Sequence, residues 1–307
     1  MPNIPFHITD EFRQRIPSVF GDEGVVWLER LPGIVAECAE RWELTVELPF
    51  DLSYNYVAPA TRIDGTPVVL KVGCPNSELD TELAALRLLG GDGVCRLLEA
   101  DPERGALLLE RVLPGTPLAA LVTEDDERAT AIAIGLMQRL WRPAPAEHPF
   151  PTVADWARGL AEHRERFDGG TGPLPTRLFE EAEECFAWLL STTTDPQLLH
   201  GDLHHDNILS ATRAPWLIID PKGIVGDPGY DLGAFLYNPI HSLLELPDPA
   251  YVIARRVDQL AEGLGMERAR VRGWGIAQAV LSACWSVESG HDWSHAITCG
   301  EYLLKVE

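Results

Sequence analysis

Three oxygen-bearing side chains follow one another in the second half of the sequence at spacings that suit phosphoryl transfer. Four residues separate Asp202 from Asn207, and a short apolar run further on leads into Asp220. Transfer of a phosphoryl group from a nucleotide needs a carboxylate near the attacking hydroxyl and oxygen ligands for magnesium, which keeps some of its own waters. We therefore expect Asp202 to be the catalytic base or hydroxyl-orienting group, and Asn207 and Asp220 to bind Mg²⁺. Each of these residue types also occurs in ordinary turns, so the prediction depends on the ordered set.

The elements around these residues are predicted from the lengths of their apolar runs. The run that leads into the loop and the run that leads into Asp220 are both short, so both are expected to be strands rather than helices. The loop also contains His204 and His205, which could ligate zinc. The Asp and Asn spacing accounts for the loop better than zinc ligation does.

The sequence around this loop resembles a known enzyme family. His-Gly-Asp-Leu-His-x-x-Asn at 200–207, followed by Ile-Ile-Asp at 218–220, resembles the kinase-like small-molecule phosphotransferases. The continuation, with Asp-Pro-Lys-Gly at 220–223 and Gly-Asp-Pro-Gly-Tyr-Asp-Leu at 226–232, is similar to one branch of the aminoglycoside phosphotransferases. This branch is the aminoglycoside/hydroxyurea antibiotic resistance kinase family, which includes streptomycin 6-phosphotransferases and hydroxyurea phosphotransferases. The resemblance extends over most of the chain and is strongest over 198–238.

The resemblance implies an α+β, protein-kinase-like fold with two lobes. Residues 1–112 would form an N-terminal lobe with a helical extension and a small antiparallel sheet, and residues 113–307 a larger, mainly helical lobe. It also implies that His200 and Asp231 support the catalytic loop. Lys222, which departs from the protein-kinase pattern, would contact the γ-phosphate or the substrate. The implied activity is ATP-dependent O-phosphorylation of a small hydroxylated molecule, with Mg²⁺ as the metal.

Lys71 is one of only three lysines in the sequence and lies inside an apolar run, Val68–Val72. An ammonium group is costly in such a position unless it is paired. The segment 77–89 is predicted to be a helix, and its apolar spacing puts Glu82 at the border of the buried face, with Glu78 one turn earlier as the competing partner. The Lys71–Glu82 pair corresponds to the kinase arrangement in which the lysine holds the α- and β-phosphates; the alternative is a purely structural ion pair.

The rest of the N-terminal lobe is predicted to be an antiparallel sheet with an Asp-Gly hairpin turn. The loop at 51–55 lies where protein kinases have a glycine-rich phosphate loop, but it contains no glycine. Ser53 and the neighbouring amides would either contact phosphate or form a polar hairpin tip. By resemblance, the carbonyl of Glu110 and the amide of Val112 would bind adenine at the hinge. The expected strands are 44–48, 56–63, 66–72, 94–100 and 106–110.

Helical periodicity covers most of the remaining chain. A long N-terminal helix is expected over 10–42, broken or restarted at Pro32, and we assign no chemistry to it. The other expected helices are 124–140, 152–167, 175–190, 230–237, 249–262, 268–289 and 291–304.

Composition limits the partners and the location of the protein. The net charge of −22 argues against nucleic acid, whose binding needs clustered Lys and Arg. It either reflects solubility or attracts a cationic substrate. No apolar run reaches the ~18 residues of a transmembrane helix, and the N-terminus lacks the pattern of a signal peptide. The six cysteines form no Cys-x-x-Cys pair and are expected to be free thiols in a reducing cytoplasm.

Three kinds of function follow from these observations. The favoured one is an O-phosphotransferase for a cationic aminoglycoside such as streptomycin, because the C-terminal helices place carboxylates beside aromatic residues, namely Trp285 with Glu288 and Asp292 with Trp293. A kinase for hydroxyurea or another small metabolite is the second. The third is a catalytically silent nucleotide-binding module, although such a module would be expected to lose the loop carboxylate or the metal ligands.

Overall fold

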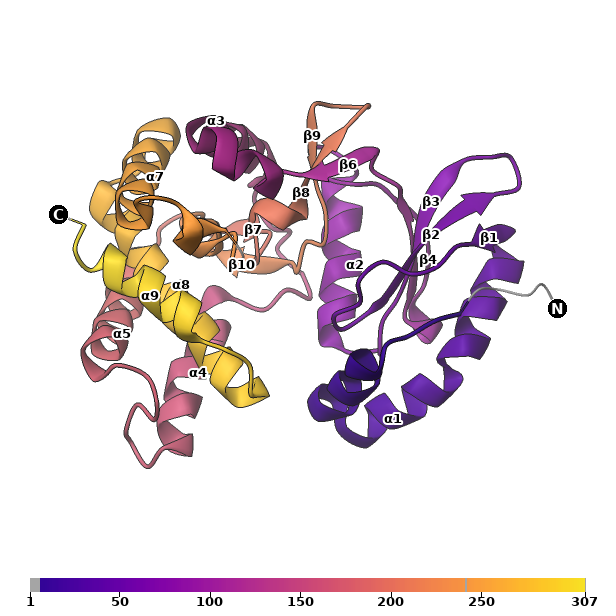
Figure 1. Cartoon of the computed structure of the whole chain (residues 1–307), viewed down its shortest axis with the longest axis horizontal. Coiled ribbons are helices and arrows are strands. Elements are labelled where there is room, and N and C mark those ends of the chain that lie inside the picture. Colours follow the sequence, from indigo (N-terminus) through magenta and orange to yellow (C-terminus); the bar gives the residue numbers. More distant parts are fainter. Residues whose placement is uncertain (1–5, 241, 307) are drawn as a thin grey trace. The chain divides into compact units, whose positions relative to one another are not determined.

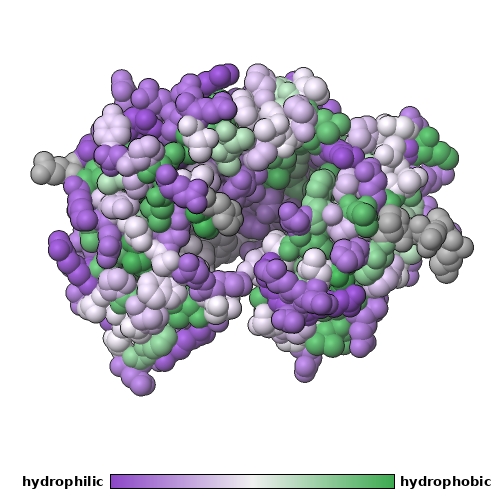
Figure 2. Space-filling model, in the orientation of Figure 1, coloured by the Kyte–Doolittle hydropathy of each residue, from purple (hydrophilic) through white to green (hydrophobic). Residues whose placement is uncertain are grey.

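The structure is a computed structural model, and it describes residues 6–240 and 242–306. The chain divides into two compact units, Met1–Val112 and Leu113–Glu307. Figure 1 labels the helices and strands of both units. In the face of the molecule that Figure 2 shows, hydrophilic residues cover much of the surface of both units, in keeping with the net charge of −22.

The first unit is built on a five-stranded antiparallel sheet with the strand order β1-β2-β3-β5-β4. The hairpin between β2 and β3 closes at the predicted Asp-Gly turn, where Gly65 has a φ of +86° and the Asp64 carboxylate accepts the N–H of Thr66 at 2.9 Å. The five strands lie within the predicted runs, although β4 starts three residues later than expected and ends one residue later. Their bounds are β1 Leu44–Val46, β2 Tyr56–Arg62, β3 Pro67–Val72, β4 Leu97–Asp101 and β5 Ala106–Glu110.

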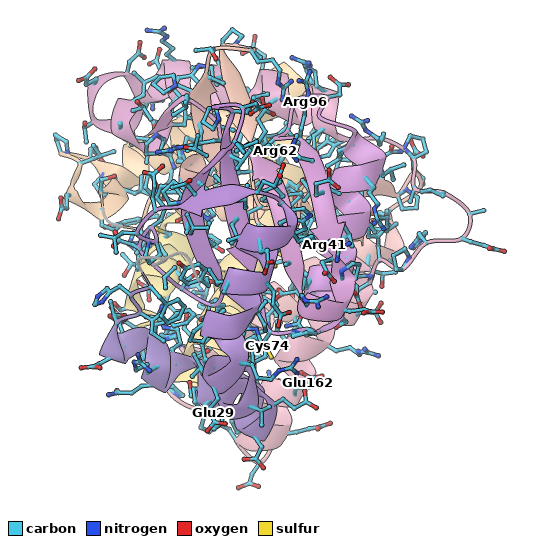
Figure 3. All side chains as sticks on the ribbon, turned by 90° about the vertical axis from the view of Figure 1, so that its right-hand side faces the viewer. Glu29, Arg41, Arg62, Cys74, Arg96 and Glu162 are labelled. Atoms are coloured by element: carbon cyan, nitrogen blue, oxygen red, sulfur yellow. The ribbon has the colours of Figure 1, made fainter. Side chains whose placement is uncertain are left out.

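Helix α1, Asp10–Arg41, packs its buried side chains into the same core as β2 and β3. Its backbone leaves the helical conformation at Gly21, which has a φ of +57°, whereas the helix continues through Pro32. The predicted break at Pro32 is therefore wrong, because the positive φ that interrupts the helix needs a residue without a Cβ atom. At its C-terminal end, Arg41 (labelled in Figure 3) donates to the buried carboxylate of Asp101 at 2.6 Å.

Helix α2 spans Ser77–Leu89, as predicted, because both of its ends are capped. The Asn76 side chain accepts the N–H of Leu79 at 2.9 Å at the N-terminus, and Gly90 adopts a left-handed conformation at the C-terminus. A short helical turn, η1 (Pro102–Arg104), links β4 to β5.

The second unit is mainly helical and carries two small sheets, β6-β8-β9 and β7-β10. Strand β6 (Pro114–Pro117) lies at the edge of its sheet, where the missing N–H groups of its prolines are tolerated. Helix α3 begins before the predicted Glu124. The bounds of these elements are β6 Pro114–Pro117, α3 Ala119–Leu140, α4 Val153–Arg166, α5 Thr176–Ser191, β7 Gln197–Leu199, η2 His205–Asn207, β8 Ile208–Ala211, β9 Trp216–Ile218, β10 Ile224–Gly226, α6 Tyr230–Tyr237, η3 Leu243–Glu245, α7 Pro249–Leu264, α8 Arg268–Ser289 and α9 Ser294–Leu303.

The core of the second unit contains a buried charge pair between α7 and α3. Arg256 on α7 is 0% exposed and bonds the carboxylate of Asp126 on α3, with an Nη2–Oδ1 distance of 2.6 Å. The same guanidinium donates to the carbonyl oxygens of Phe235 at 3.1 Å and Asn238 at 2.5 Å. Because a buried charge without partners is strongly destabilising, this pair fixes α3, α6 and α7 together.

Within the described ranges, no helix is both long and apolar enough to span a bilayer.

Candidate active site

Asp231 on α6 is fully buried and holds the backbone at the start of the 200–207 loop. Its Oδ1 accepts the N–H of Gly201 at 2.8 Å, and its Oδ2 accepts the N–H of His200 at 3.0 Å and the indole N–H of Trp141 at 3.0 Å. Burial raises the pKa of the Asp231 carboxyl, and the neighbouring His200 and these three donors oppose that shift. The backbone directly before Asp202 is therefore fixed by one buried carboxyl group.

The imidazole ring of His200 joins the loop to the segment that follows β9. Its Nδ1 accepts the N–H of Asp202 at 3.1 Å, and its Nε2 donates to the carbonyl oxygen of Ile219 at 2.8 Å. Burial lowers the pKa of His200, which agrees with a neutral ring that donates on one side and accepts on the other. The carbonyl of His200 also accepts the N–H of Lys222 at 2.8 Å. These bonds bring the segment that contains Asp220 beside the loop.

Asn207 and Asp220 present oxygen atoms from two neighbouring pieces of backbone. The Asn207 Nδ2 donates to the carbonyl of Asp202 at 3.0 Å, and the carbonyl of Asn207 accepts the N–H of Ile219 at 2.9 Å. The side-chain oxygen of Asn207 accepts no hydrogen bond from the part of the chain that the structure describes. Asp220 has a φ of +59°, an uncommon conformation for a residue with a Cβ atom, and one that clusters at functional sites.

This donor set fits magnesium and does not fit zinc. An amide oxygen and a carboxylate are hard ligands, and Mg²⁺ keeps several waters, so two protein ligands are enough. Across residues 6–240 and 242–306, no group of three or more His, Cys, Asp or Glu side chains is arranged to hold a metal.

The carboxylate of Asp202 is 42% exposed, with His204 Nε2 at 3.8 Å from its Oδ2. It is therefore accessible to a hydroxyl group. Burial disfavours the charged form of His204, but its hydrogen bond to Asp206 and the charges of Asp202, Asp206 and Asp220 outweigh burial and raise its pKa.

The side chain of Lys222 lies beside one of the candidate metal ligands. Its Nζ donates to Oδ2 of Asp220 at 3.0 Å, and both side chains are partly exposed. The ammonium group is thus held next to the carboxylate for which we expect a role in metal binding.

In the first unit, Lys71 on β3 pairs with Glu82 on α2. The distance between Lys71 Nζ and Glu82 Oε1 is 2.7 Å, and each residue is 5% exposed. Glu78, the competing partner, is exposed on the same helix. The helical periodicity of α2 therefore identified which glutamate turns toward the lysine.

Ser53 is exposed in the loop between β1 and β2. The same loop approaches the end of β3, because a Cβ atom at Gly73 would lie 2.4 Å from Oδ1 of Asn55. The end of the Asn55 side chain thus lies against the backbone of Gly73, two residues after Lys71. The loop is thus held beside the strand that carries the lysine, although it lacks a glycine-rich sequence of its own.

Glu110 ends β5, and the next two residues complete the first unit. The Glu110 N–H donates to the carbonyl of Arg96 at 2.8 Å, and its carboxylate accepts the N–H of Arg96 at 2.9 Å. The N–H of Val112 finds no acceptor among residues 6–240 and 242–306, so this amide is available to a ligand.

Sequence reasoning missed two tryptophans at the loop. Trp141 follows α3 and donates to the buried carboxyl of α6, as described above. Trp156 on α4 lies against the loop: a Cβ atom at Gly201, whose φ is +91°, would lie 3.0 Å from Cη2 of the Trp156 ring. The Trp156 ring also packs edge-on against Tyr230 and Trp285, with centroid distances of 5.9 and 5.7 Å. The spacing of residues within one helix carries no signal for such contacts between helices.

The carboxylates that the sequence places beside aromatic residues near the C-terminus have partners within the chain. Glu288 forms an ion pair with Arg166 at 2.5 Å. Asp292 accepts the N–H and the hydroxyl of Ser294, each at 2.9 Å, and the backbone hydrogen bond lowers its pKa. Trp285, by contrast, is 38% exposed and stands next to the Trp156 ring.

Comparison with solved structures identifies the class of fold. The chain is similar to a choline kinase from Streptococcus pneumoniae, with a TM-score of 0.62, 16% identity, and coverage of 90% of this chain and 98% of that one. It is also similar to a thermostable mutant of the aminoglycoside phosphotransferase APH(4)-Ia in complex with ADP and hygromycin B, with a TM-score of 0.61, 14% identity, and coverage of 88% and 96%. The predicted α+β, protein-kinase-like fold is confirmed.

Sequence comparison then identifies the family. The profile of the family described as "Aminoglycoside/hydroxyurea antibiotic resistance kinase" matches residues 41–290. The chain is 37% identical over 273 residues to a streptomycin 6-kinase of Streptomyces glaucescens, covering 88% of each chain. It is 37% identical over 278 residues to a hydroxyurea phosphotransferase of Kitasatospora aureofaciens, covering 88% of this chain and 77% of that one. The protein belongs to the aminoglycoside/hydroxyurea antibiotic resistance kinase family, and the predicted class of enzyme, a small-molecule kinase, is confirmed.

Proposed function

We propose that the protein transfers the γ-phosphoryl group of ATP to a hydroxyl group of streptomycin or of a closely related aminoglycoside. The observation that carries this proposal is the 200–207 loop, in which the buried Asp231 and His200 present an accessible Asp202 carboxylate next to Asn207 and Asp220. Phosphoryl transfer depends mainly on the positions and charges of such groups.

The residues of the proposed site have different roles in this reaction. The substrate oxygen bonds to the γ-phosphorus, the bond between that phosphorus and the ADP oxygen breaks, and the hydroxyl proton passes to the carboxylate of Asp202. Lys71 holds the α- and β-phosphates, and Glu82 orients Lys71. Asn207 and Asp220 hold Mg²⁺, which, when bound, neutralises charge on the phosphate oxygens.

We also propose further contacts to the nucleotide and the phosphate, which rest on the positions of these residues in the kinase-like fold. The N–H of Val112 and the carbonyl of Glu110 bind adenine, and amides near Ser53 contact phosphate. Lys222, whose Nζ donates to Asp220 at 3.0 Å, would contact the γ-phosphate or the substrate.

Three observations support a cationic aminoglycoside as the acceptor. Streptomycin 6-kinases of Streptomyces glaucescens and Streptomyces griseus are 37% and 35% identical to this chain. The net charge of −22 attracts cations. The Trp156 ring lies against the loop backbone next to Asp202, where an aromatic face can contact a guanidinium or ammonium group.

Hydroxyurea is the second candidate, because a hydroxyurea phosphotransferase is as similar to this chain as one of the streptomycin 6-kinases, at 37% identity. Hydroxyurea is small and neutral, so it has no use for an acidic surface or for an aromatic contact to a cation. These features favour the aminoglycoside.

Replacement of Asp220 and of Lys71 is expected to affect nucleotide binding in different ways. Asp220→Asn removes a charged metal ligand, so it should weaken ATP binding only when Mg²⁺ is present. Lys71→Ala removes a cation that meets the phosphates directly, so it should weaken ATP binding with and without Mg²⁺, by about tenfold or more, since hydrogen bonds to charged groups contribute about 1.5–3 kcal/mol. Calorimetric titration of ATP at several Mg²⁺ concentrations measures both effects. An identical response of the two variants to Mg²⁺ would contradict the division of roles.

Streptomycin is expected to be phosphorylated when it is supplied at about 1 mM, which is the upper end of common KM values. At the same concentration its turnover should be faster than that of hydroxyurea. Electrostatic attraction of a cation is screened by salt, with a Debye length of about 10 Å at 0.1 M. The KM for streptomycin should therefore rise with ionic strength, whereas the KM for hydroxyurea should not. A coupled ADP-release assay with mass spectrometry of the product measures both.

Trp156→Leu serves as the matched variant for the same assay. It should raise the KM for streptomycin about fivefold, in line with ~1 kcal/mol for a cation–aromatic contact, and leave the KM for hydroxyurea unchanged. Turnover of hydroxyurea without turnover of streptomycin would refute the aminoglycoside assignment while keeping the kinase.

A further inference from the structure

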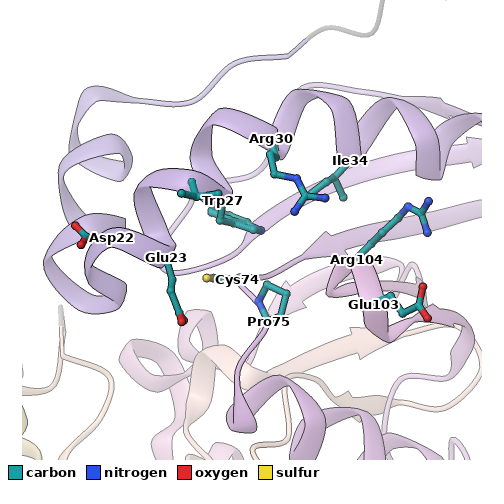
Figure 4. A pocket seen from close by; sticks show the side chains of 10 residues that line it. Asp22, Glu23, Trp27, Arg30, Ile34, Cys74, Pro75, Glu103 and Arg104 are labelled. Carbon is teal, nitrogen blue, oxygen red and sulfur yellow. The ribbon is translucent and has the colours of Figure 1, made fainter.

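The first unit contains a cavity that involves none of the residues assigned above. It has a volume of about 390 Å³ and lies between α1, the connection from β3 to α2, and η1 (Figure 4). This volume is within the range of ~300–1,000 Å³ that is usual for small-molecule sites. The α1 residues that line it precede the segment 41–290 that matches the family profile, so this wall of the cavity lies outside the family match.

The floor of the cavity is apolar and contains one polar atom without a partner. Trp27, Ile34 and Cys74 are 4%, 6% and 4% exposed. The indole nitrogen of Trp27 is buried, and within the described residues it has no hydrogen-bond acceptor. Figure 4 shows the nitrogen edge of this ring turned toward the space above Cys74. Because a buried N–H without an acceptor is destabilising, an acceptor atom on a bound molecule would stabilise this site.

The polar rim of the cavity carries charges of both signs. Glu23 and Arg30 lie on the same face of α1 as Trp27, and in Figure 4 they extend along opposite sides of the indole. Neither forms an ion pair or a hydrogen bond with any residue in 6–240 or 242–306. Arg104, the other cation of the rim, is already bound by Glu37 at 2.7 Å and by the carboxylate of Asp101 at 2.9 Å. Burial raises the pKa of the Cys74 thiol, and the negative charge of Glu23 raises it further. The Glu23 carboxylate is therefore close enough to act electrostatically on the floor of the cavity.

From this arrangement we propose that the cavity binds a zwitterionic amino acid with a large apolar side chain. The carboxylate of the ligand would meet Arg30 and the N–H of Trp27, and its ammonium group would meet Glu23. Its side chain would lie on Ile34 and Cys74. A purely anionic ligand would leave Glu23 unpaired, and a purely cationic ligand would provide no acceptor for Trp27 or Arg30.

The position of the cavity connects it to the Lys71–Glu82 pair. Cys74 lines the cavity in the connection between β3, which carries Lys71, and α2, which carries Glu82. The same connection is fixed to η1 at Gly73, whose N–H donates to the carbonyl of Gly105 at 2.9 Å. A ligand in the cavity would therefore stabilise the segment that orders the pair. This consequence for turnover rests on the proposed function, whereas binding itself does not.

The experiment compares three probes with the same phenyl group, titrated calorimetrically into the full chain. L-Phenylalanine has both charges, 3-phenylpropionate lacks the ammonium group, and 2-phenylethylamine lacks the carboxylate. We expect L-phenylalanine to bind at least about tenfold more tightly than either analogue. Absence of binding by L-phenylalanine up to its solubility limit, or equal affinity for all three probes, would overturn the proposal.

Two charge-neutral variants test the orientation of the ligand. Arg30→Gln should weaken L-phenylalanine and 3-phenylpropionate about tenfold and leave 2-phenylethylamine unchanged; Glu23→Gln should weaken L-phenylalanine and 2-phenylethylamine and leave 3-phenylpropionate unchanged. Arg13→Gln and Glu29→Gln, on the same helix but outside the cavity lining, are the matched controls and should change nothing. Equal effects of the cavity variants and the control variants would overturn the site. All of these outcomes are affinities measured without the kinase reaction. A failure of the proposed function can therefore be distinguished from a failure of the site.

Discussion

Asp202→Ala is expected to lower kcat about 10²–10⁴-fold, the usual contribution of a positioned general base, while ATP binding stays nearly unchanged. The carboxylate is 42% exposed and is held by backbone that Asp231 and His200 fix on its N-terminal side. We propose that it meets the acceptor hydroxyl and not the nucleotide. Steady-state kinetics with streptomycin, together with calorimetric titration of ATP, measures the two effects separately.

Asp195→Ala is the matched control for this variant, because Asp195 is exposed just before β7 and carries the same charge. It should leave kcat unchanged. If Asp202→Ala kept its turnover within about tenfold of the natural protein, a barrier difference of only ~1.4 kcal/mol, Asp202 would not be the base.

Asp231→Ala is expected to reduce both stability and activity strongly. The substitution leaves three buried donors without an acceptor, namely the N–H groups of His200 and Gly201 and the indole N–H of Trp141. Removing one partner from a buried charged network costs about 3–5 kcal/mol. The loop that carries Asp202 would also lose its anchor, so kcat should fall more than the folded fraction does. Urea unfolding measures the loss of stability. The value of kcat, measured at urea concentrations where the variant is folded, measures the loss of activity.

Trp141→Phe removes only one of the three donors and provides a graded comparison. It should cost about 1–3 kcal/mol, the range for one hydrogen bond to a charged group and the cost of an unpaired partner, and should lower kcat less than Asp231→Ala. Equal unfolding midpoints for Asp231→Ala and the natural protein would show that this carboxyl does not hold the loop.

The sequence alone was enough to select the candidate residues of the site and to predict most of the local elements that carry them. The spacing of Asp202, Asn207 and Asp220 indicates one loop and the strand that follows it, because these spacings are short enough for local backbone geometry to limit where the side chains go. The choice of Glu82 over Glu78 as the partner of Lys71 follows from helical periodicity, which determines the faces of a helix from its own residues. Helix α2 begins and ends as predicted because its caps are also local.

Other features were decided only by the tertiary structure. The indole of Trp141 donates to Asp231 across 90 positions of sequence, and the Trp156 ring lies on Gly201. Glu288 and Asp292 have partners within the chain, so the carboxylates that the sequence suggested for a cationic substrate are already paired. The cavity beside Trp27 likewise depends on how α1 packs over the end of β3. A residue's periodicity reports which way its own side chain faces, but not which distant side chain packs against it. Those contacts depend on the shapes and volumes of all the packed elements at once.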